Sequence, residues 1–148
     1  MVTLTAYGTD QTAAHEAFLR AFEEVDRLGK LMGTGSASDV SRINGAAAGF
    51  AVSVSPETAG LIRESLELSR QSEGAFDITF APVGKIWDYK AQPFVVPDKA
   101  AIAAAVANVG YKNLSLEGTT VVKARDGLAI GLGAIAKGGT APIRAVYE

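Results

Sequence analysis

The nine-residue stretch Gly74–Pro82 constrains this chain most, because it places one carboxylate inside an apolar run. Its sequence is G-A-F-D-I-T-F-A-P. Gly74 gives backbone freedom at the end of a preceding helix, whereas the β-branched pair Ile78–Thr79 favours an extended backbone. Asp77 must be paired or hydrogen-bonded if it is buried between its apolar neighbours. The stretch predicts a helix end followed by a strand, with Asp77 either bonding backbone amides or serving a binding site.

Upstream of this stretch, apolar periodicity predicts two strands and two helices. Residues alternate between apolar and polar in Val2–Tyr7 and again in Phe50–Val54, which is typical of half-buried strands. Thr12–Met32 has apolar residues at helical spacing and is expected to be an amphipathic helix. Ser38–Asn44 is interpreted as a short polar turn. The Ser-Pro-Glu start at Ser55 then predicts a helix that ends near the glycine of the central stretch.

Downstream, an alanine-rich helix and further strands are expected. The helix begins at Pro97-Asp98 and ends with Gly110 as the residue after its last turn. Leu114–Val122 predicts a hairpin, and Leu128–Ile130 a further strand. The core face of the helix is predicted to hold Ile102, Val106 and Val109. Helices mixed with hairpins indicate an α+β fold, an antiparallel sheet with helices packed on one face, in a single domain over residues 1–148.

Composition excludes several functional classes. The net charge of −2 argues against a nucleic-acid-binding surface. The chain has no cysteine, so disulfides and thiolate metal sites are excluded, and its only histidine, His15, is expected to be solvent-exposed. No apolar run reaches the ~18 residues of a membrane span, and no charged leader opens the chain. These patterns leave the cellular compartment open.

The glycine-rich segment Gly131–Gly139 matches two nucleotide-binding patterns incompletely. It follows the G-x-G-x-x-A order of a dinucleotide site, but too few residues remain for the second strand and the acidic residue. It has the glycine spacing of a P-loop, but Lys137 precedes the second glycine. The segment is therefore either a tight turn ending a strand or a turn that brings backbone amides and a lysine to a phosphate.

Several motifs together resemble one family, the FAD:protein FMN transferases, ApbE. Their order and spacing are specific as a set, and the resemblance runs from about residue 2 to about residue 140. The motifs are Val2–Gly8, Ser38–Asn44 (S-D-V-S-R-I-N), Gly74–Pro82, Trp87, Val109–Tyr111 and Gly133–Gly138 (G-A-I-A-K-G).

This resemblance implies an ApbE/T-fold-like architecture and a magnesium-dependent enzyme. Such an enzyme binds FAD, cleaves its pyrophosphate and attaches FMN to a threonine or serine of a target flavoprotein. By position, Ala75, Phe76 and Asp77 resemble the family's flavin-nucleotide contact. Lys137 resembles a contact to FAD, and the carbonyl of Ala134 resembles one ligand of Mg²⁺. Family members commonly work on the outer side of the bacterial cytoplasmic membrane.

The chain departs from the family pattern in ways that leave alternatives open. Thr34-Gly35 stands where the family has an aromatic residue, and Gly131 where it often has aspartate. The family's second half, with a histidine and the remaining magnesium ligands, has no match here. The chain thus resembles an N-terminal portion: an active transferase, a truncated or degenerate FAD-binding module, or a fragment that needs a C-terminal half or oligomeric partner.

A shared nucleotide site requires residues that are far apart in the sequence to lie close together in the fold. Asp77 and Lys137 should face one cleft, with Trp87 near its rim. In the alternative, Asp77 bonds its own local amides and Lys137 lies in solvent on an unrelated face.

Overall fold

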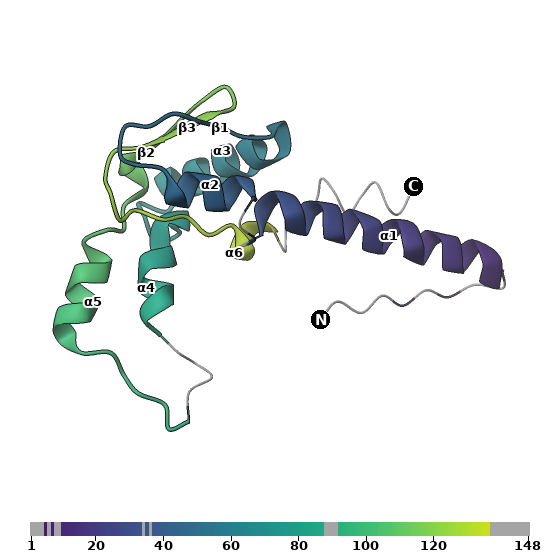
Figure 1. Cartoon of the computed structure of the whole chain (residues 1–148), viewed down its shortest axis with the longest axis horizontal. Coiled ribbons are helices and arrows are strands. Elements are labelled where there is room, and N and C mark those ends of the chain that lie inside the picture. Colours follow the sequence, from purple (N-terminus) through teal and green to yellow (C-terminus); the bar gives the residue numbers. More distant parts are fainter. Residues whose placement is uncertain are drawn as a thin grey trace.

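The computed structural model describes residues 5, 7, 10–33, 35, 37–87 and 92–136. Its elements, in chain order, are α1 (Gln11–Met32), α2 (Asp39–Gly45), β1 (Val52–Ser53), α3 (Pro56–Gln71), the 3₁₀ turn η1 (Ile78–Phe80), α4 (Ala81–Ile86), α5 (Lys99–Val106), the 3₁₀ turn η2 (Tyr111–Asn113), β2 (Leu114–Glu117), β3 (Thr120–Lys123) and α6 (Gly133–Ala136). The sheet lies with α2 and α3, while α1 extends away and α4 and α5 descend side by side (Figure 1). The predicted α+β fold with an antiparallel sheet is confirmed.

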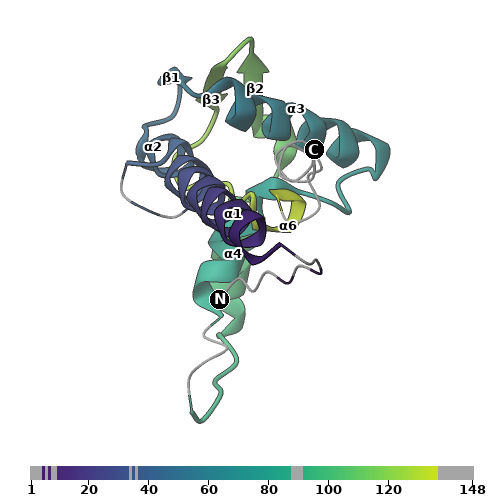
Figure 2. The ribbon, with the colours of Figure 1, turned by 90° about the vertical axis from the view of Figure 1, so that its right-hand side faces the viewer.

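The sheet has three antiparallel strands in the order β1-β3-β2. The predicted hairpin is confirmed, with Leu116 opposite Val121 and a turn in which Gly118 has a φ of +58°. Val121 also pairs with Val52 of β1. In Figure 2, where α1 is seen end-on, α3 runs across below the strands.

The core lies between the sheet, α2 and α3. Ile43 of α2 and Ile62 of α3 have no exposed surface, and Val121 of β3 is 1% exposed. Ser38–Asn44 is therefore not the polar turn expected from the sequence. It forms most of a short helix, because Ser38 accepts a hydrogen bond from Ser41 N at 3.0 Å and so caps it. Val40 and Ile43 lie three residues apart on this helix, so both face the core.

The helix starts predicted from capping residues are confirmed. Ser55 caps α3 through Thr58 N at 3.1 Å, and Asp98 caps α5 through Ala101 N at 2.7 Å. The core face predicted for this helix is wrong at Val106, which is 52% exposed, whereas Ala105 is buried and Ile102 and Val109 are half-buried. Alanine makes up most of α5, so the bulk of its side chains does not mark which side of the helix faces α4. The helix ends at Val106, so Gly110, whose φ is +151°, does not cap it.

Two strand predictions are wrong and one falls largely outside the described residues. The chain after Phe76 forms η1 and α4 instead of a strand, and Leu128–Ile130 is buried but belongs to no strand. Phe50 is 64% exposed, so the strand expected there is shortened to β1. Most of Val2–Tyr7 lies outside the described residues. His15 is exposed as expected, and no described helix is both long and apolar enough to cross a membrane.

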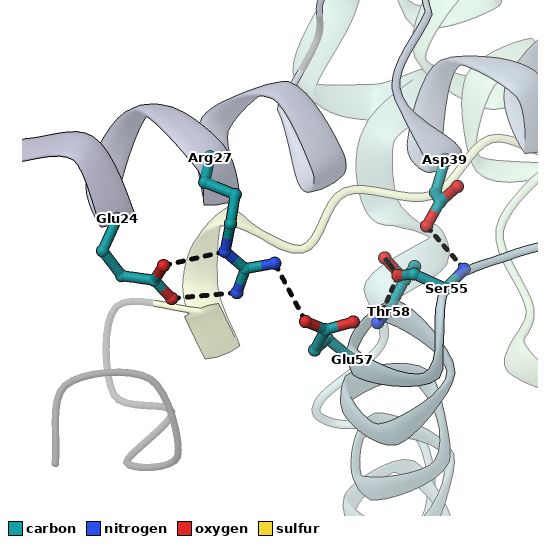
Figure 3. A network of polar contacts seen from close by, with 6 residues as sticks. All are labelled: Glu24, Arg27, Asp39, Ser55, Glu57 and Thr58. Carbon is teal, nitrogen blue, oxygen red and sulfur yellow. Dashed lines mark hydrogen bonds and ion pairs between the residues drawn. The ribbon is translucent and has the colours of Figure 1, made fainter. Parts of the chain in front are cut away.

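Polar contacts fix α1 and α2 against the start of α3 (Figure 3). Arg27 binds Glu24 on its own helix and Glu57 on α3, the latter at 2.9 Å. Asp39 is only 5% exposed; it accepts from Ser55 N at 2.9 Å and pairs with Arg42. Burial alone would raise the pKa of Asp39. The hydrogen bonds from Ser55, Thr58 and Arg42 together outweigh burial and hold this pKa below its ordinary value of 3.8.

We expect Asp39→Asn to lower the free energy of unfolding at pH 7 by about 1–3 kcal/mol, because hydrogen bonds to a charged acceptor are replaced by weaker ones. The pKa of Asp39 is lower in the folded state than in the unfolded state, so its carboxylate stabilises the folded protein at pH values above the unfolded pKa. This contribution to stability is lost as the pH falls through the folded-state pKa. The gap between wild type and variant, measured by urea denaturation, should therefore narrow below pH 3.8. Glu67→Gln, at an exposed pair with Arg70, should show little change at either pH.

Candidate functional site

Asp77 ends the small-residue turn after α3 and caps η1. Its Oδ1 accepts hydrogen bonds from Thr79 N at 2.8 Å and from Thr79 Oγ1 at 2.6 Å. An aspartate that bonds the amide two residues on holds a tight turn, so the chain curls here instead of extending. Gly74 supplies the left-handed conformation that precedes the turn, with a φ of +89°.

The same carboxylate reaches a segment more than thirty residues away. Its Oδ2 accepts from Tyr111 N at 2.8 Å, and Thr79 Oγ1 accepts from Gly110 N at 2.7 Å. Thr79 has no exposed surface. Two motifs named in the sequence, around Asp77 and around Tyr111, are therefore joined by part-buried hydrogen bonds. The expectation that Asp77 bonds backbone amides holds for a distant amide as well as a local one.

The second wall of the site is the extended segment that leads into α6. Gly131 N donates to Ile78 O at 2.8 Å, which ties this segment to η1. The Asn44 side chain accepts from Ile130 N at 2.7 Å and donates to Ile130 O at 3.0 Å. One amide side chain thus supplies the two hydrogen bonds that a neighbouring strand would otherwise make.

The side chain of Lys123 also holds this segment in place through hydrogen bonds to backbone carbonyls. It is 3% exposed, and its Nζ donates to Asn44 O at 3.0 Å and to Leu128 O at 3.1 Å. Burial lowers the pKa of Lys123, Asp126 opposes that shift and Lys85 adds to it. Lys123 was not identified as a functional residue from the sequence. The available signal was its place two residues after the buried Val121, on the inward side of a strand.

A cavity of about 560 Å³ lies between the two walls, a size typical of small-molecule sites. It brings together the predicted contacts Ala75, Phe76 and Asp77 with the predicted magnesium ligand Ala134. The full lining is Gly74, Ala75, Phe76, Asp77, Ile78, Phe80, Ala81, Gly84, Val109, Gly131, Gly133 and Ala134.

The two other predicted members of the site, Trp87 and Lys137, are not both placed by the described structure. Trp87 is not a lining residue and instead stacks on Phe94, with ring centroids 6.1 Å apart. The prediction that it lies near the rim is not supported by the lining. Lys137 lies outside the described residues, so its convergence with Asp77 stays a prediction.

The described donors do not make a complete magnesium site. Mg²⁺ requires near-octahedral oxygen coordination. Asp77 is the one carboxylate among the lining residues, and both of its oxygens already accept hydrogen bonds. Across the described part of the chain, no group of three or more histidine, cysteine, aspartate or glutamate side chains could hold a metal ion. The role of the Ala134 carbonyl as a magnesium ligand stays a prediction.

The model of the ApbE family matches residues 1–142. A curated FAD:protein FMN transferase of Klebsiella pneumoniae is 32% identical over 140 residues, covering 93% of this chain and 43% of the relative. One from Vibrio cholerae is 33% identical over 112 residues, 74% of this chain and 34% of the relative. The chain thus spans about a third to under a half of these relatives.

Solved structures agree. The flavin transferase ApbE from Vibrio cholerae superposes with a TM-score of 0.81 at 28% identity, covering 94% of this chain and 45% of that one. The ApbE protein from Thermotoga maritima gives a TM-score of 0.77 at 26% identity, with the same two coverages.

Proposed function

The chain belongs to the ApbE family, and on that premise we propose that it holds the flavin nucleotide in an FAD:protein FMN transferase. The proposed reaction moves FMN from FAD to a threonine or serine hydroxyl of a target flavoprotein, with Mg²⁺. The observation that carries the proposal is the cavity that joins Ala75, Phe76 and Asp77 to Ala134.

In this reaction the acceptor hydroxyl oxygen forms a bond to the phosphorus of the FMN moiety. The pyrophosphate P–O bond breaks, the hydroxyl loses its proton and AMP leaves. A divalent cation offsets phosphate charge in such transfers, and here its ligands must come in part from outside the described residues. Asp77 fixes the loop that would contact the nucleotide, because its oxygens hold the Thr79 and Tyr111 amides in place.

The proposal predicts FAD binding by this chain, measured as a change in flavin fluorescence on titration. Lys137→Ala should weaken binding about 5- to 20-fold if the lysine meets a phosphate as a point charge, whereas Lys99→Ala, on a helix whose residues do not line the cavity, should not. Failure of the wild-type chain to bind FAD would overturn the proposed role.

Transfer itself is tested by incubation with FAD, Mg²⁺ and an acceptor flavoprotein, scored as covalent yellow product. We expect little or no product from these 148 residues, because the described donors leave the magnesium site incomplete. A longer chain that contains them and spans the length of the relatives should form product. If it does not, the assignment as a transferase is wrong.

A second candidate is an FAD-binding module that needs a C-terminal half or an oligomeric partner. The exposed side of α1 favours it. Ala21 is the one buried residue of this 22-residue helix, while Leu19, Phe22 and Val25 are 52%, 43% and 38% exposed. An apolar helix side of this kind is typical of a surface that another element covers. FAD binding by the longer chain or by an oligomer, but not by these 148 residues as a monomer, would support this candidate.

A further inference from the structure

We propose that Phe80 and Gly84 form the face of the cavity on which a fused heteroaromatic ring of the flavin nucleotide stacks. The inference deepens the proposed function and rests on it. Phe80 immediately precedes α4 and Gly84 lies one turn later, so both project from the same side of the helix. Both line the cavity that holds the predicted nucleotide contacts.

Phe80 lines the cavity yet is 54% exposed, while its neighbours Ile78 and Thr79 are 3% and 0% exposed. The turn that Asp77 caps therefore buries Ile78 and Thr79 and leaves Phe80 exposed beside the cavity. An aromatic face of this kind stacks on planar rings and shows little preference among them.

Gly84 leaves open the space over which such a ring would lie. A Cβ placed there meets no atom within 4 Å, and its φ is not in the left-handed region. Glycine inside a helix is less stable than alanine, so nothing in the fold requires glycine at this position. A ligand that approaches the helix backbone does require it, because even a methyl group would occupy that space.

The charges of the lining favour the ring over the phosphates. Among the described lining residues there is no lysine or arginine, and the single charged group, Asp77, is a carboxylate already bound to Thr79 and Tyr111. Most of the remaining lining consists of glycine and alanine. A neutral planar group suits this part of the surface, whereas a phosphate placed beside Asp77 would meet a like charge.

The test measures FAD affinity by fluorescence titration of the full chain. Phe80→Ala should raise the Kd for FAD about 5- to 150-fold, and Phe80→Tyr, which keeps the aromatic face, should restore most of the affinity. Phe50→Ala is the matched control, because Phe50 is 64% exposed and does not line the cavity. Its Kd should equal that of wild type.

Gly84→Ala separates a binding role from a structural one. It should raise the melting temperature by about 1–4 °C, as alanine does in a helix, while weakening FAD binding at least about 5-fold. Gly60→Ala in α3, where a Cβ also meets nothing within 4 Å, should raise the melting temperature similarly and leave affinity unchanged.

Competition identifies the ring. Riboflavin or adenosine should displace FAD from the wild-type chain and should lose that ability with Phe80→Ala. The compound that loses it shows which end of FAD stacks on Phe80. Inorganic pyrophosphate should displace FAD equally well from both proteins. An unchanged Kd in both Phe80→Ala and Gly84→Ala, with wild type still binding FAD, would overturn this inference and leave the proposed function standing. Loss of FAD binding by wild type itself would overturn the proposed function.

Discussion

Asp77→Ala is expected to lower the free energy of unfolding by about 3–5 kcal/mol and to abolish measurable FAD binding. Three donors lose their acceptor at once: the N–H and hydroxyl of Thr79 and the N–H of Tyr111. Thr79 has no exposed surface, so polar groups left without a partner there are costly. The loop that forms one wall of the cavity would lose its tie to the neighbouring segment. Urea denaturation and FAD titration measure the two effects.

The chain offers a matched control in Asp98, another aspartate that caps a helix. Its carboxylate accepts one exposed hydrogen bond, from Ala101 N. Asp98→Ala should cost only about 1 kcal/mol and leave FAD affinity unchanged. Asp77→Asn keeps one acceptor oxygen and should fold well enough for its affinity to be measured. If Asp77→Ala proved no more destabilising than Asp98→Ala, the tie between η1 and Tyr111 would carry little energy, contrary to this account.

Asn44→Ala is expected to cost about 2–4 kcal/mol and to weaken FAD binding at least tenfold. The change removes both hydrogen bonds to the backbone of Ile130, which is 1% exposed, and leaves its N–H and C=O unpaired. Gly131 follows Ile130 directly and lines the cavity, so this wall of the cavity should lose its fixed position. Chemical denaturation and FAD titration again report stability and binding separately.

Asn108→Ala is the control for that change, because the Asn108 side chain bonds only the carbonyl of Ala104, one turn back on an exposed surface. It should change the free energy of unfolding by less than about 1 kcal/mol. Equal effects of the two substitutions would mean that the Asn44 side chain does not hold the cavity wall.

Helix starts were predictable because capping is local. Ser55 and Asp98 bond amides three residues away, and those spacings are visible in the sequence. The strand expected after Phe76 was wrong for a related reason. The β-branched pair Ile78–Thr79 favours extension, but the Asp77 cap and the distant Tyr111 amide hold the chain in a turn. Propensity is a weak prior, and a contact more than thirty residues away overrode it.

The site was predictable only through resemblance. That resemblance singled out Ala75, Phe76, Asp77 and Ala134, and the structure places all four on one cavity. Asn44 and Lys123 were missed as parts of the framework, because their partners are backbone groups of Ile130 and Leu128 that sequence spacing does not connect. Phe80 and Gly84 were missed because an apolar residue and a glycine carry no chemical signal until a cavity is seen beside them.

The cavity draws its walls from three stretches that a ribosome delivers at well-separated times. Gly74–Gly84 is made first, Val109 later and Gly131–Ala134 last. A growing chain that stops before Gly131 lacks the last of these stretches, even though the residues of α1 and α3 have all been made. If the cavity binds the nucleotide as proposed, nucleotide can stabilise the site only in chains translated past Ala134, since a ligand favours by mass action the species that binds it.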